Sequence, residues 1–401
     1  MMGVEVHNFG CRLNIAEGEA IRLAAADAGA ITVINSCAVT NEAVQKARQA
    51  VRRAARTRPG ARIVVTGCAA QIDPARFAAM PEVAAVIGNR EKRLASAYSG
   101  AGEVGDIFTV APLLAPVVSG RDHARAFVEV QTGCDHRCTF CIIPFGRGNS
   151  ASAPASAVIE AIGAAVARGQ QEVILTGVDL TSYEGGLGLL VARILKDVPE
   201  LPRLRLSSLD PMEVDPLLFE LLTTEPRMMP HVHLSLQAGD DMILKRMKRR
   251  HSRTHAVDLV QNLRTARPEI AIGADIIAGF PTEDEAMFAN SLALVDDCDI
   301  VFGHIFPFSP RAGTPAARMP QISATLARSR AATLRLAVGA RKAAWLASLV
   351  GSSQKVLVER DGVSGHAENF ANVALNPATP GSIITLRIAT SDGERLLESA
   401  Q

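Results

Sequence analysis

The sequence predicts an α/β protein in three parts: an open parallel βαβ sheet, an incomplete (β/α)6 barrel and a small β-barrel. Strand-like and helix-like runs alternate through residues 1–115, and the alternation continues in six βα units through residues 122–345. Such alternation indicates parallel sheets with right-handed crossovers. Several short strands follow within residues 350–401, which is typical of a small β-barrel. These three ranges are the predicted domains.

The composition is that of an ordinary globular protein. The chain has 401 residues, of which 48% are hydrophobic and 21% are charged. It contains no apolar run of about 18 residues and no recognisable secretory signal, so we expect a cytoplasmic protein without a membrane partner. Seven cysteines indicate metal or redox chemistry rather than a disulfide framework. The net charge of +1 leaves any nucleic-acid partner to local basic patches.

Each predicted strand of the first part ends at a cysteine. The strands are expected at 4–9, 31–35 and 63–66, with helices at 17–28 and 41–56, and they lead to Cys11, Cys37 and Cys68. Because ligands of such sheets sit at the carboxyl ends of the strands, these cysteines should converge at one edge. A lone cysteine there is usually a small buried hydrophobe, but three at the same structural position indicate an iron–sulfur cluster with one iron left open.

The six predicted βα units of the central part follow a linker at residues 97–123, which holds Pro112 and Pro116. Strands are expected at 126–131, 172–176, 203–207, 231–235, 270–277 and 299–305. Helices are expected between them at 157–167, 187–196, 216–223, 255–265 and 284–295. Active sites of parallel barrels lie at the carboxyl ends of the strands. The loop after the first strand is therefore the first place to look for chemistry.

That loop carries Cys134, Cys138 and Cys141 in the spacing C-x3-C-x2-C. Thiolates crowded so closely bind a soft metal centre or form disulfides. A four-iron cluster needs a fourth ligand, and no fourth local cysteine follows, so one iron would be open to a non-protein ligand. A structural zinc knuckle is the alternative, but His136 lies inside the loop, where it is awkwardly placed to complete such a site.

Polar residues and glycines follow the other barrel strands. They are candidates for holding a cofactor, because glycine allows close backbone approach and polar side chains can hydrogen-bond it. The candidates are Gly177, Asp179, Ser207, Gln237 and Gly279. Ordinary turn chemistry explains any single one of them equally well. We interpret Cys298, which stands alone, as a structural residue.

The last part alternates at 354–360, turns at Asp361-Gly362 and has another strand at 381–388. A basic helix at 328–342 is expected to connect it to the barrel.

Several motifs resemble those of the methylthiotransferases, radical S-adenosylmethionine (SAM) enzymes that carry two clusters. In the first part these are FGCRLN (9–14), NSCAVT (35–40), VTGCAAQ (65–71) and Gly88-Asn89. In the barrel they are LTGVDL (175–180), SLQAGDD (235–241) and GADIIAGFPTE (273–283). Phe140 matches the aromatic residue usual before the third thiolate. Residues 35–40 resemble the MtaB-type branch, which modifies N6-threonylcarbamoyladenosine in tRNA, whereas the isopentenyladenosine branch typically has Arg in place of Thr40.

This resemblance implies a radical SAM barrel and two [4Fe–4S] clusters. Cys134, Cys138 and Cys141 would hold the cluster that cleaves SAM to methionine and a 5′-deoxyadenosyl radical. The radical would take a hydrogen from C2 of adenosine 37 in the anticodon loop. Cys11, Cys37 and Cys68 would hold the auxiliary cluster, which carries the sulfur, already methylated by a second SAM. An electron donor such as a flavodoxin or ferredoxin is implied, and the sulfur donor is left open.

The same resemblance suggests where RNA is bound. Two basic patches are expected to contact phosphates, although a solvated basic face is the alternative for each. They contain Arg52 and Arg53 in the first part, and Lys245, Lys248, Arg249 and Arg250 in the barrel. Residues 363–370 resemble the TRAM module, an RNA-binding β-barrel, although a small barrel can equally be a packing element.

One departure concerns the loop after Cys141. The family usually has an Arg-rich segment ending in Arg-Pro there, whereas this chain has GRGNSASAP at 146–154. Substrate contacts of that loop are therefore in doubt. Two alternatives keep the chemistry and change the substrate, to isopentenyladenosine 37 or to a ribosomal-protein aspartate. A third alternative is an iron–sulfur RNA-binding protein without catalysis.

Overall fold

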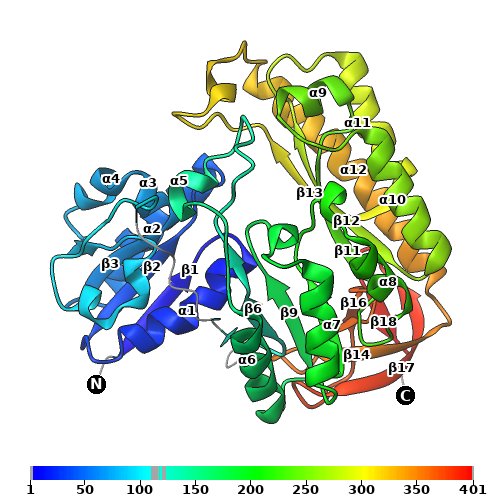
Figure 1. Cartoon of the computed structure of the whole chain (residues 1–401), viewed down its shortest axis with the longest axis horizontal. Coiled ribbons are helices and arrows are strands. Elements are labelled where there is room, and N and C mark those ends of the chain that lie inside the picture. The colour runs from blue at the N-terminus through cyan, green and yellow to red at the C-terminus, as the bar shows by residue number, and fades with distance from the viewer. Residues whose placement is uncertain (1–2, 110–115, 117, 120–122, 400–401) are drawn as a thin grey trace.

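A computed structural model describes residues 3–109, 116, 118–119 and 123–399 (Figure 1). The first part is a parallel sheet in the order β1-β2-β3-β4. Its strands are β1 (Val4–Asn8), β2 (Ile31–Ser36), β3 (Arg62–Gly67) and β4 (Ala85–Val86). Helices α1 (Arg12–Ala24) and α2 (Asn41–Thr57) cross between the strands, followed by α3 (Cys68–Ile72) and α4 (Pro74–Ala78). The predicted βαβ sheet is confirmed.

Helix α1 begins at Arg12, earlier than the predicted start at residue 17. The side chain of Asn14 explains the difference, because it donates hydrogen bonds to the backbone oxygens of Phe9 and Ser36. These bonds fix the first helical turn to the ends of β1 and β2. The polar Arg12 and Asn14 gave no apolar periodicity from which this start could be recognised.

The central part is an incomplete barrel of six parallel strands. They are β6 (Ala126–Glu129), β9 (Glu172–Thr176), β10 (Arg203–Leu206), β11 (His231–Gln237), β12 (Ala271–Ala278) and β13 (Ile300–Pro307). Regular pairing is interrupted between β10 and β11, where only isolated parallel bridges join Leu204 to Met228 and Leu209 to Leu234. A short strand, β5 (Val118–Ser119), pairs antiparallel with β6. It lies within the predicted linker and covers the edge of β6. Pro112 and the predicted domain limits at residues 115 and 122 lie outside the described residues, so they stay predictions.

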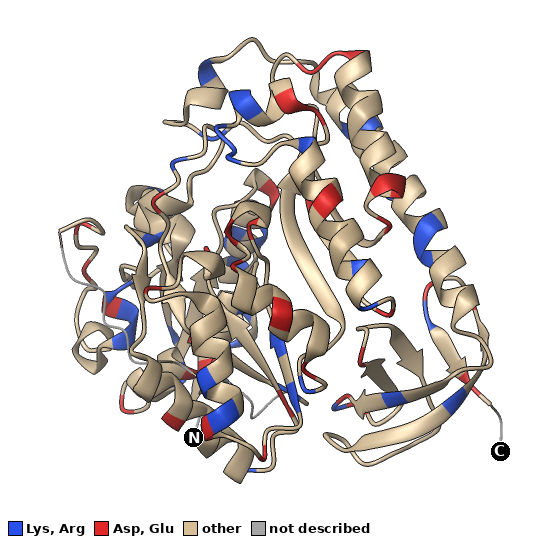
Figure 2. Ribbon diagram, turned by 45° about the vertical axis from the view of Figure 1, so that its right-hand side comes forward, with Lys and Arg blue, Asp and Glu red and all other residues tan. Residues whose placement is uncertain are grey.

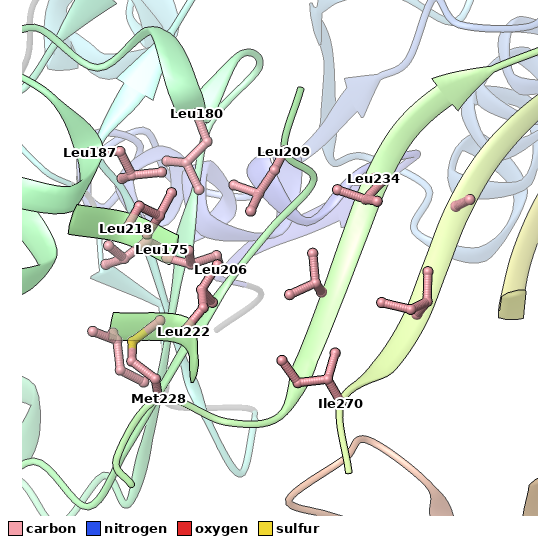
Figure 3. Packing of buried hydrophobic residues seen from close by; sticks show 14 of the residues in the cluster. Leu175, Leu180, Leu187, Leu206, Leu209, Leu218, Leu222, Met228, Leu234 and Ile270 are labelled. Carbon is pink, nitrogen blue, oxygen red and sulfur yellow. The ribbon is translucent and has the colours of Figure 1, made fainter. Parts of the chain in front are cut away.

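Helices cover the outside of this barrel and bury its main apolar core. They are α6 (Ala155–Ala167), α7 (Leu187–Asp197), α8 (Pro216–Thr224), α10 (Arg253–Ala266), α11 (Glu285–Asp297) and α12 (Ala324–Ser348). Figure 3 shows leucines of the strands and helices meeting in this core, among them Leu175, Leu206 and Leu218. Cys298, which follows α11, is buried in the same cluster, as expected of a structural residue.

The short helices α3, α4, α5 (Ile143–Arg147) and α9 (Asp241–Arg246) were not predicted. Helix α9 begins after Asp240, whose carboxylate accepts hydrogen bonds from the backbone nitrogens of Met242 and Ile243. The basic run that starts at Lys245 therefore lies at a helix end and in the loop after it.

The last part is a closed five-stranded barrel in the order β14-β15-β16-β18-β17. Its strands are β14 (Ser353–Val358), β15 (Ser364–Ala367), β16 (Asn372–Ala374), β17 (Ile383–Ser391) and β18 (Leu396–Glu398). It docks on the central part through arginines of β10, since Arg205 donates to the backbone oxygens of Ala367 and Glu368. The fold class is thus confirmed in all three parts. No helix in the described part of the chain is long and apolar enough to cross a membrane.

Buried charges stabilise this junction between the two barrels. The carboxylate of Glu172 lies 2.9 Å from Nε of Arg125, 2.9 Å from Nε of Arg205 and 3.8 Å from Nη1 of Arg203. Arg125 also reaches Glu359 of the small barrel at 2.5 Å. Burial raises the pKa of Glu172, but the charges of Arg205 and Arg125 outweigh it and bring the pKa down to about 2.

We predict that Glu172→Ala strongly destabilises the protein, because it leaves buried arginines without their shared counter-charge. The expected loss of unfolding free energy is about 3–5 kcal/mol, measured by urea denaturation. The lowered pKa means that Glu172 stabilises the fold above its unfolded pKa of about 4.3, and that this contribution disappears as the pH falls towards about 2. Glu184→Ala, at an exposed glutamate, is the control and should change stability by less than about 0.5 kcal/mol. An equal loss of unfolding free energy in both variants would contradict a stabilising role for the buried charges at Glu172.

Candidate active site

The cysteines of the N-terminal sheet lie together, as predicted. Cys11 precedes α1, Cys37 follows β2 directly, and Cys68 begins α3 after β3. A Cβ added to Gly10 would lie 2.5 Å from Sγ of Cys37, so the first cysteine loop passes directly over the second. Burial, together with the neighbouring Cys68 and Cys11 thiols, raises the pKa of Cys37 to about 12. Metal coordination would replace that thiol proton.

The second trio occupies the loop between β7 (Gln131–Thr132) and α5 (Ile143–Arg147). The loop begins at Gly133, whose φ is +70° and whose missing Cβ would lie 1.9 Å from the backbone oxygen of Asn149. The backbone N–H of Cys134 donates to Gly148, and that of Cys141 donates to Cys138. Burial and the nearby Cys138 raise the pKa of Cys141 to about 12. All seven cysteines of the chain are free of disulfides.

The two trios face one another across α3 and α5. A Cβ added to Gly146 would lie 3.0 Å from Cβ of Cys68. Asn89 joins the two elements, because its Nδ2 lies 2.6 Å from the backbone oxygen of Gly146 and 3.5 Å from Sγ of Cys68. The charge of Cys68 also contributes to the pKa of Cys141. Six free thiols from two separate folding units therefore border one region.

Arg147 is buried behind the first trio. Its guanidinium donates to both carboxylate oxygens of Glu17 at 3.0 and 2.9 Å and to Oδ1 of Asn14 at 2.7 Å. Burial lowers the pKa of Arg147, but the charges of Cys68 and Glu17 outweigh it and raise the pKa well above its ordinary value. The sequence predicts that Arg147 lies in a loop whose substrate contacts are in doubt. The structure gives it a different place, between the N-terminal sheet and the cluster loop.

Further charges surround Glu17. Lys92 Nζ lies 2.7 Å from its carboxylate, and Arg93 contacts both Glu17 and Glu129. Three cations thus share two carboxylates beside Cys11 and Cys68. The excess positive charge suits thiolates and the cluster that they would hold.

Among the predicted barrel residues, Asp179 lies close to Cys134. Asp179 Oδ2 is 3.6 Å from Cys134 Sγ, and the hydroxyl of Ser207 is buried without a hydrogen-bond partner in the described structure. Gln237 ends β11 with a φ of +67°. Gly177 has no room for a Cβ, which would lie 2.9 Å from Oε1 of Gln131. That oxygen also accepts the backbone N–H groups of residues 178 and 179.

Two candidates have a packing explanation. Phe140 packs beside an apolar cluster that includes Ile243 and Phe280. A Cβ on Gly279 would lie 2.5 Å from Cβ of Ala327 in α12, so close helix packing requires this glycine. Contact with a cofactor remains a prediction for both residues.

Arg249 requires a correction. Its side chain is only 7% exposed, and Nη2 lies 2.8 Å from both Asp210 Oδ2 and the backbone oxygen of Ser235. Nη1 lies 3.7 Å from Sγ of Cys138. The residue supports the cluster loop and is not available to RNA phosphates, because its guanidinium is buried inside the barrel, where Nη1 and Nη2 have partners and Nε has none in the described structure. Linear spacing within a basic run could not distinguish it from its exposed neighbours.

The remaining predicted RNA contacts are exposed. They are Arg52, Arg53, Lys245, Lys248 and Arg250. Arg250 already pairs with Glu213 and His136. Basic and acidic residues are interspersed along the ribbon (Figure 2).

The position of His136 also differs from expectation. Its Nε2 lies 3.1 Å from Asp179 Oδ2 and 3.4 Å from Glu213 Oε1. With Cys134 and Asp179 it forms a group that could hold a metal ion, so the histidine is not awkwardly placed. The carboxylates that hydrogen-bond His136 nevertheless raise its pKa, Glu213 first, and this favours an imidazolium over a metal ligand.

The residues present fit the iron–sulfur groups that the sequence implies. Each trio offers three free thiols and no fourth cysteine, which leaves one iron of a cubane open. The buried hydroxyl of Ser207, which follows β10, has no partner in the described structure and can offer a hydrogen bond to a polar ligand.

Comparison with known proteins identifies the class first. Residues 128–295 match the radical SAM superfamily, and residues 3–88 match a family described as "Uncharacterized protein family UPF0004". A radical SAM methyltransferase, TsrM from Kitasatospora setae with cobalamin and a [4Fe–4S] cluster bound, has a similar fold. Its TM-score is 0.54 at 14% identity, covering 72% of this chain and 66% of that one. The protein is a radical SAM enzyme, and SAM and a [4Fe–4S] cluster are its cofactors.

Curated relatives then define the family. The threonylcarbamoyladenosine tRNA methylthiotransferase MtaB of Rickettsia prowazekii is 45% identical over 93% of this chain and 91% of its own length. The MtaB of Thermotoga maritima is 34% identical over 80% of this chain and 77% of its own length. A tRNA-2-methylthio-N(6)-dimethylallyladenosine synthase from Erythrobacter litoralis is 31% identical over 89% and 86%. The chain belongs to the family of tRNA methylthiotransferases.

We predict that Arg147→Met weakens iron binding by the N-terminal trio, because it removes the buried cation beside Cys11 and Cys68. Glu17 keeps Lys92 as a partner, so we expect a folded protein that has lost about 3 kcal/mol of stability. Iron per chain after anaerobic reconstitution is the measurement. The control is Arg168→Met, at an exposed arginine that directly follows α6. Normal iron content in Arg147→Met would show that Arg147 serves only the packing of the two parts.

Proposed function

We propose that the enzyme adds a methylthio group to C2 of N6-threonylcarbamoyladenosine at position 37 of tRNA, using two [4Fe–4S] clusters. The observation that carries this proposal is the convergence of two cysteine trios, from the N-terminal sheet and from the barrel, on one region beside Gly146. A radical chemistry that also delivers sulfur needs two such centres within reach of one base. When bound, the barrel cluster and SAM supply a 5′-deoxyadenosyl radical, and the second cluster supplies the sulfur.

The chain's own residues bind and orient these groups. Cys134, Cys138 and Cys141 hold the SAM-cleaving cluster, and Arg249 steadies the loop through its contact with Cys138. Ser207, Asp179 and Gln237 border the barrel mouth, where they hydrogen-bond polar parts of SAM. Phe140, Gly177 and Gly279 shape the walls around them.

Cys11, Cys37 and Cys68 hold the second cluster. The buried cations Arg147 and Lys92 offset its negative charge from the protein side.

The curated relatives support the choice of substrate. A relative named for threonylcarbamoyladenosine is 45% identical over 93% of this chain, and relatives named for dimethylallyladenosine reach 36% identity over 78%. Modification of isopentenyladenosine 37 is therefore the second candidate. Base 37 is single-stranded, which suits a site between two folding units. Exposed Arg52, Arg53, Lys245 and Lys248 contact the phosphates, and the C-terminal barrel binds RNA as TRAM modules do. A flavodoxin or ferredoxin supplies electrons in the cytoplasm.

We predict that the two cysteine trios fail in different ways when replaced by alanine. Wild type should hold about eight irons per chain, and each triple variant about four. C134A/C138A/C141A should abolish reductive SAM cleavage. C11A/C37A/C68A should still cleave SAM but form no methylthio product. Cys298→Ala, at a buried cysteine outside both trios, is the control and should retain full iron and activity.

About four irons in wild type would contradict two clusters. Absence of 5′-deoxyadenosine from the wild type after reduction would contradict radical catalysis.

The substrate is tested by nucleoside mass spectrometry of tRNA from cells with and without the gene. Deletion should remove 2-methylthio-N6-threonylcarbamoyladenosine and leave its unthiolated precursor in its place. An unchanged level of that nucleoside, with loss of the isopentenyl analogue, would assign the enzyme to the second candidate.

A further inference from the structure

Arg12 is a cation that forms no direct ion pair with any described residue. It follows Cys11 in the chain and is the first residue of α1. Its side chain makes no ion pair and no hydrogen bond with any described residue. Its guanidinium carbon lies 5.3 Å from the centroid of the Phe370 ring. Arg125 and Arg205 approach the same ring at 5.7 and 5.0 Å, but both also pair with Glu172. Arg12 is thus distinguished from its neighbours by its free hydrogen-bond donors.

Polar side chains of three consecutive barrel strands lie near Arg12. Asp275 Oδ1 of β12 is 3.2 Å from Nε2 of His233 in β11 and 3.1 Å from Nδ1 of His304 in β13. Their apolar neighbours at 234, 236, 274 and 276 belong to the core under the helices, so these three side chains point to the opposite, inner face. The side chain of His304 is 60% exposed. The inner wall therefore offers an accessible imidazole on the same face as Asp275 and His233.

The charges here favour an anion. The guanidinium groups of Arg12, Arg125 and Arg205 all lie against the ring of Phe370, so positive charge gathers there. Asp275 is already engaged by two histidines and does not contact Arg12 directly. A partly buried cation without a partner is costly, and an anionic ligand removes that cost.

We propose that Arg12 binds the carboxylate of the threonyl group on the substrate base, with His304 as an additional hydrogen-bond donor. This inference rests on the proposed function and specifies how the substrate is distinguished. A guanidinium binds a carboxylate through two parallel hydrogen bonds. An isopentenyl group is apolar and would leave Arg12 unpaired. Because Arg12 adjoins Cys11, a base held by its threonyl group lies next to the trio assigned to sulfur delivery.

The hydrogen-bond donors of Arg12 and His304 could instead bind a phosphate of the RNA backbone. The test therefore distinguishes the threonyl carboxylate from a phosphate as the bound anion. Three anticodon stem-loops are compared: one with N6-threonylcarbamoyladenosine at position 37, one with the threonyl carboxylate converted to its amide, and one with plain adenosine. Kd, KM and kcat are measured for wild type, Arg12→Gln and Arg12→Lys. Wild type should prefer the carboxylate over the amide by about 10-fold or more in Kd.

Arg12→Gln should lose this preference by weakening only the carboxylate stem-loop, and Arg12→Lys should retain part of it. Arg22→Gln, in the same helix, is the matched control and should behave as wild type. Phe370→Leu removes the ring beneath the guanidinium and tests for a purely structural role. If it reproduces the Arg12→Gln result on every stem-loop, Arg12 acts by packing and the inference is overturned.

Equal weakening of all three stem-loops in Arg12→Gln would assign Arg12 to a phosphate. Persistence of the carboxylate preference in Arg12→Gln would also overturn the inference, although the proposed function would stand. If wild type thiolates the isopentenyl stem-loop and not the threonylcarbamoyl one, the proposed function itself fails.

Discussion

The buried ion pair between Arg147 and Glu17 is the interaction on which the arrangement of the site depends. Glu17 belongs to the helix that follows Cys11, and Arg147 belongs to the helix that follows Cys141. The two hydrogen bonds between them, at 3.0 and 2.9 Å, therefore set one cysteine loop against the other. Breaking a buried pair costs more than most single contacts, so the two parts of the chain are held in a fixed relation.

This arrangement follows from the position of the functional loops in parallel sheets. Both the N-terminal sheet and the barrel place loops at the carboxyl ends of their strands. Joining the two edges brings six thiols together although they are spread from Cys11 to Cys141 in the chain. The C-terminal barrel contributes at a second place, where its Phe370 contacts Arg12, Arg125 and Arg205. The N-terminal sheet, the central barrel and the C-terminal barrel therefore all meet around this ring.

Much of the fold could be predicted because its signals are local. Strand runs such as 172–176 and the alternation with helices determined the fold class, and the spacing of Cys134, Cys138 and Cys141 indicated the metal chemistry. The clustering of Cys11, Cys37 and Cys68 could be inferred from topology alone. The network around Arg147 could not, since its partners Asn14 and Glu17 are more than a hundred residues away in the chain. Arg249 was misassigned for the same reason, because its partners Asp210 and Cys138 lie on other loops.

The His233–Asp275–His304 group was missed as well. The only sequence signal was the alternation of histidines at 231 and 233 in a strand, which also fits a buried polar face. In the proposed recognition of the substrate, this group acts together with Arg12, which belongs to a different folding unit. Residues from two folding units leave no local signal in the sequence, whereas the cysteine spacings that indicate the cofactor chemistry are short motifs.

The proposed chemistry requires that the radical generated with one trio act on the same base carbon that receives sulfur from the other. Its most direct test is a stem-loop carrying deuterium at C2 of the modified adenosine 37, incubated with reconstituted enzyme, SAM and reductant. We predict that 5′-deoxyadenosine acquires one deuterium for each methylthio group formed. Methylthio product accompanied by unlabelled 5′-deoxyadenosine would contradict this requirement.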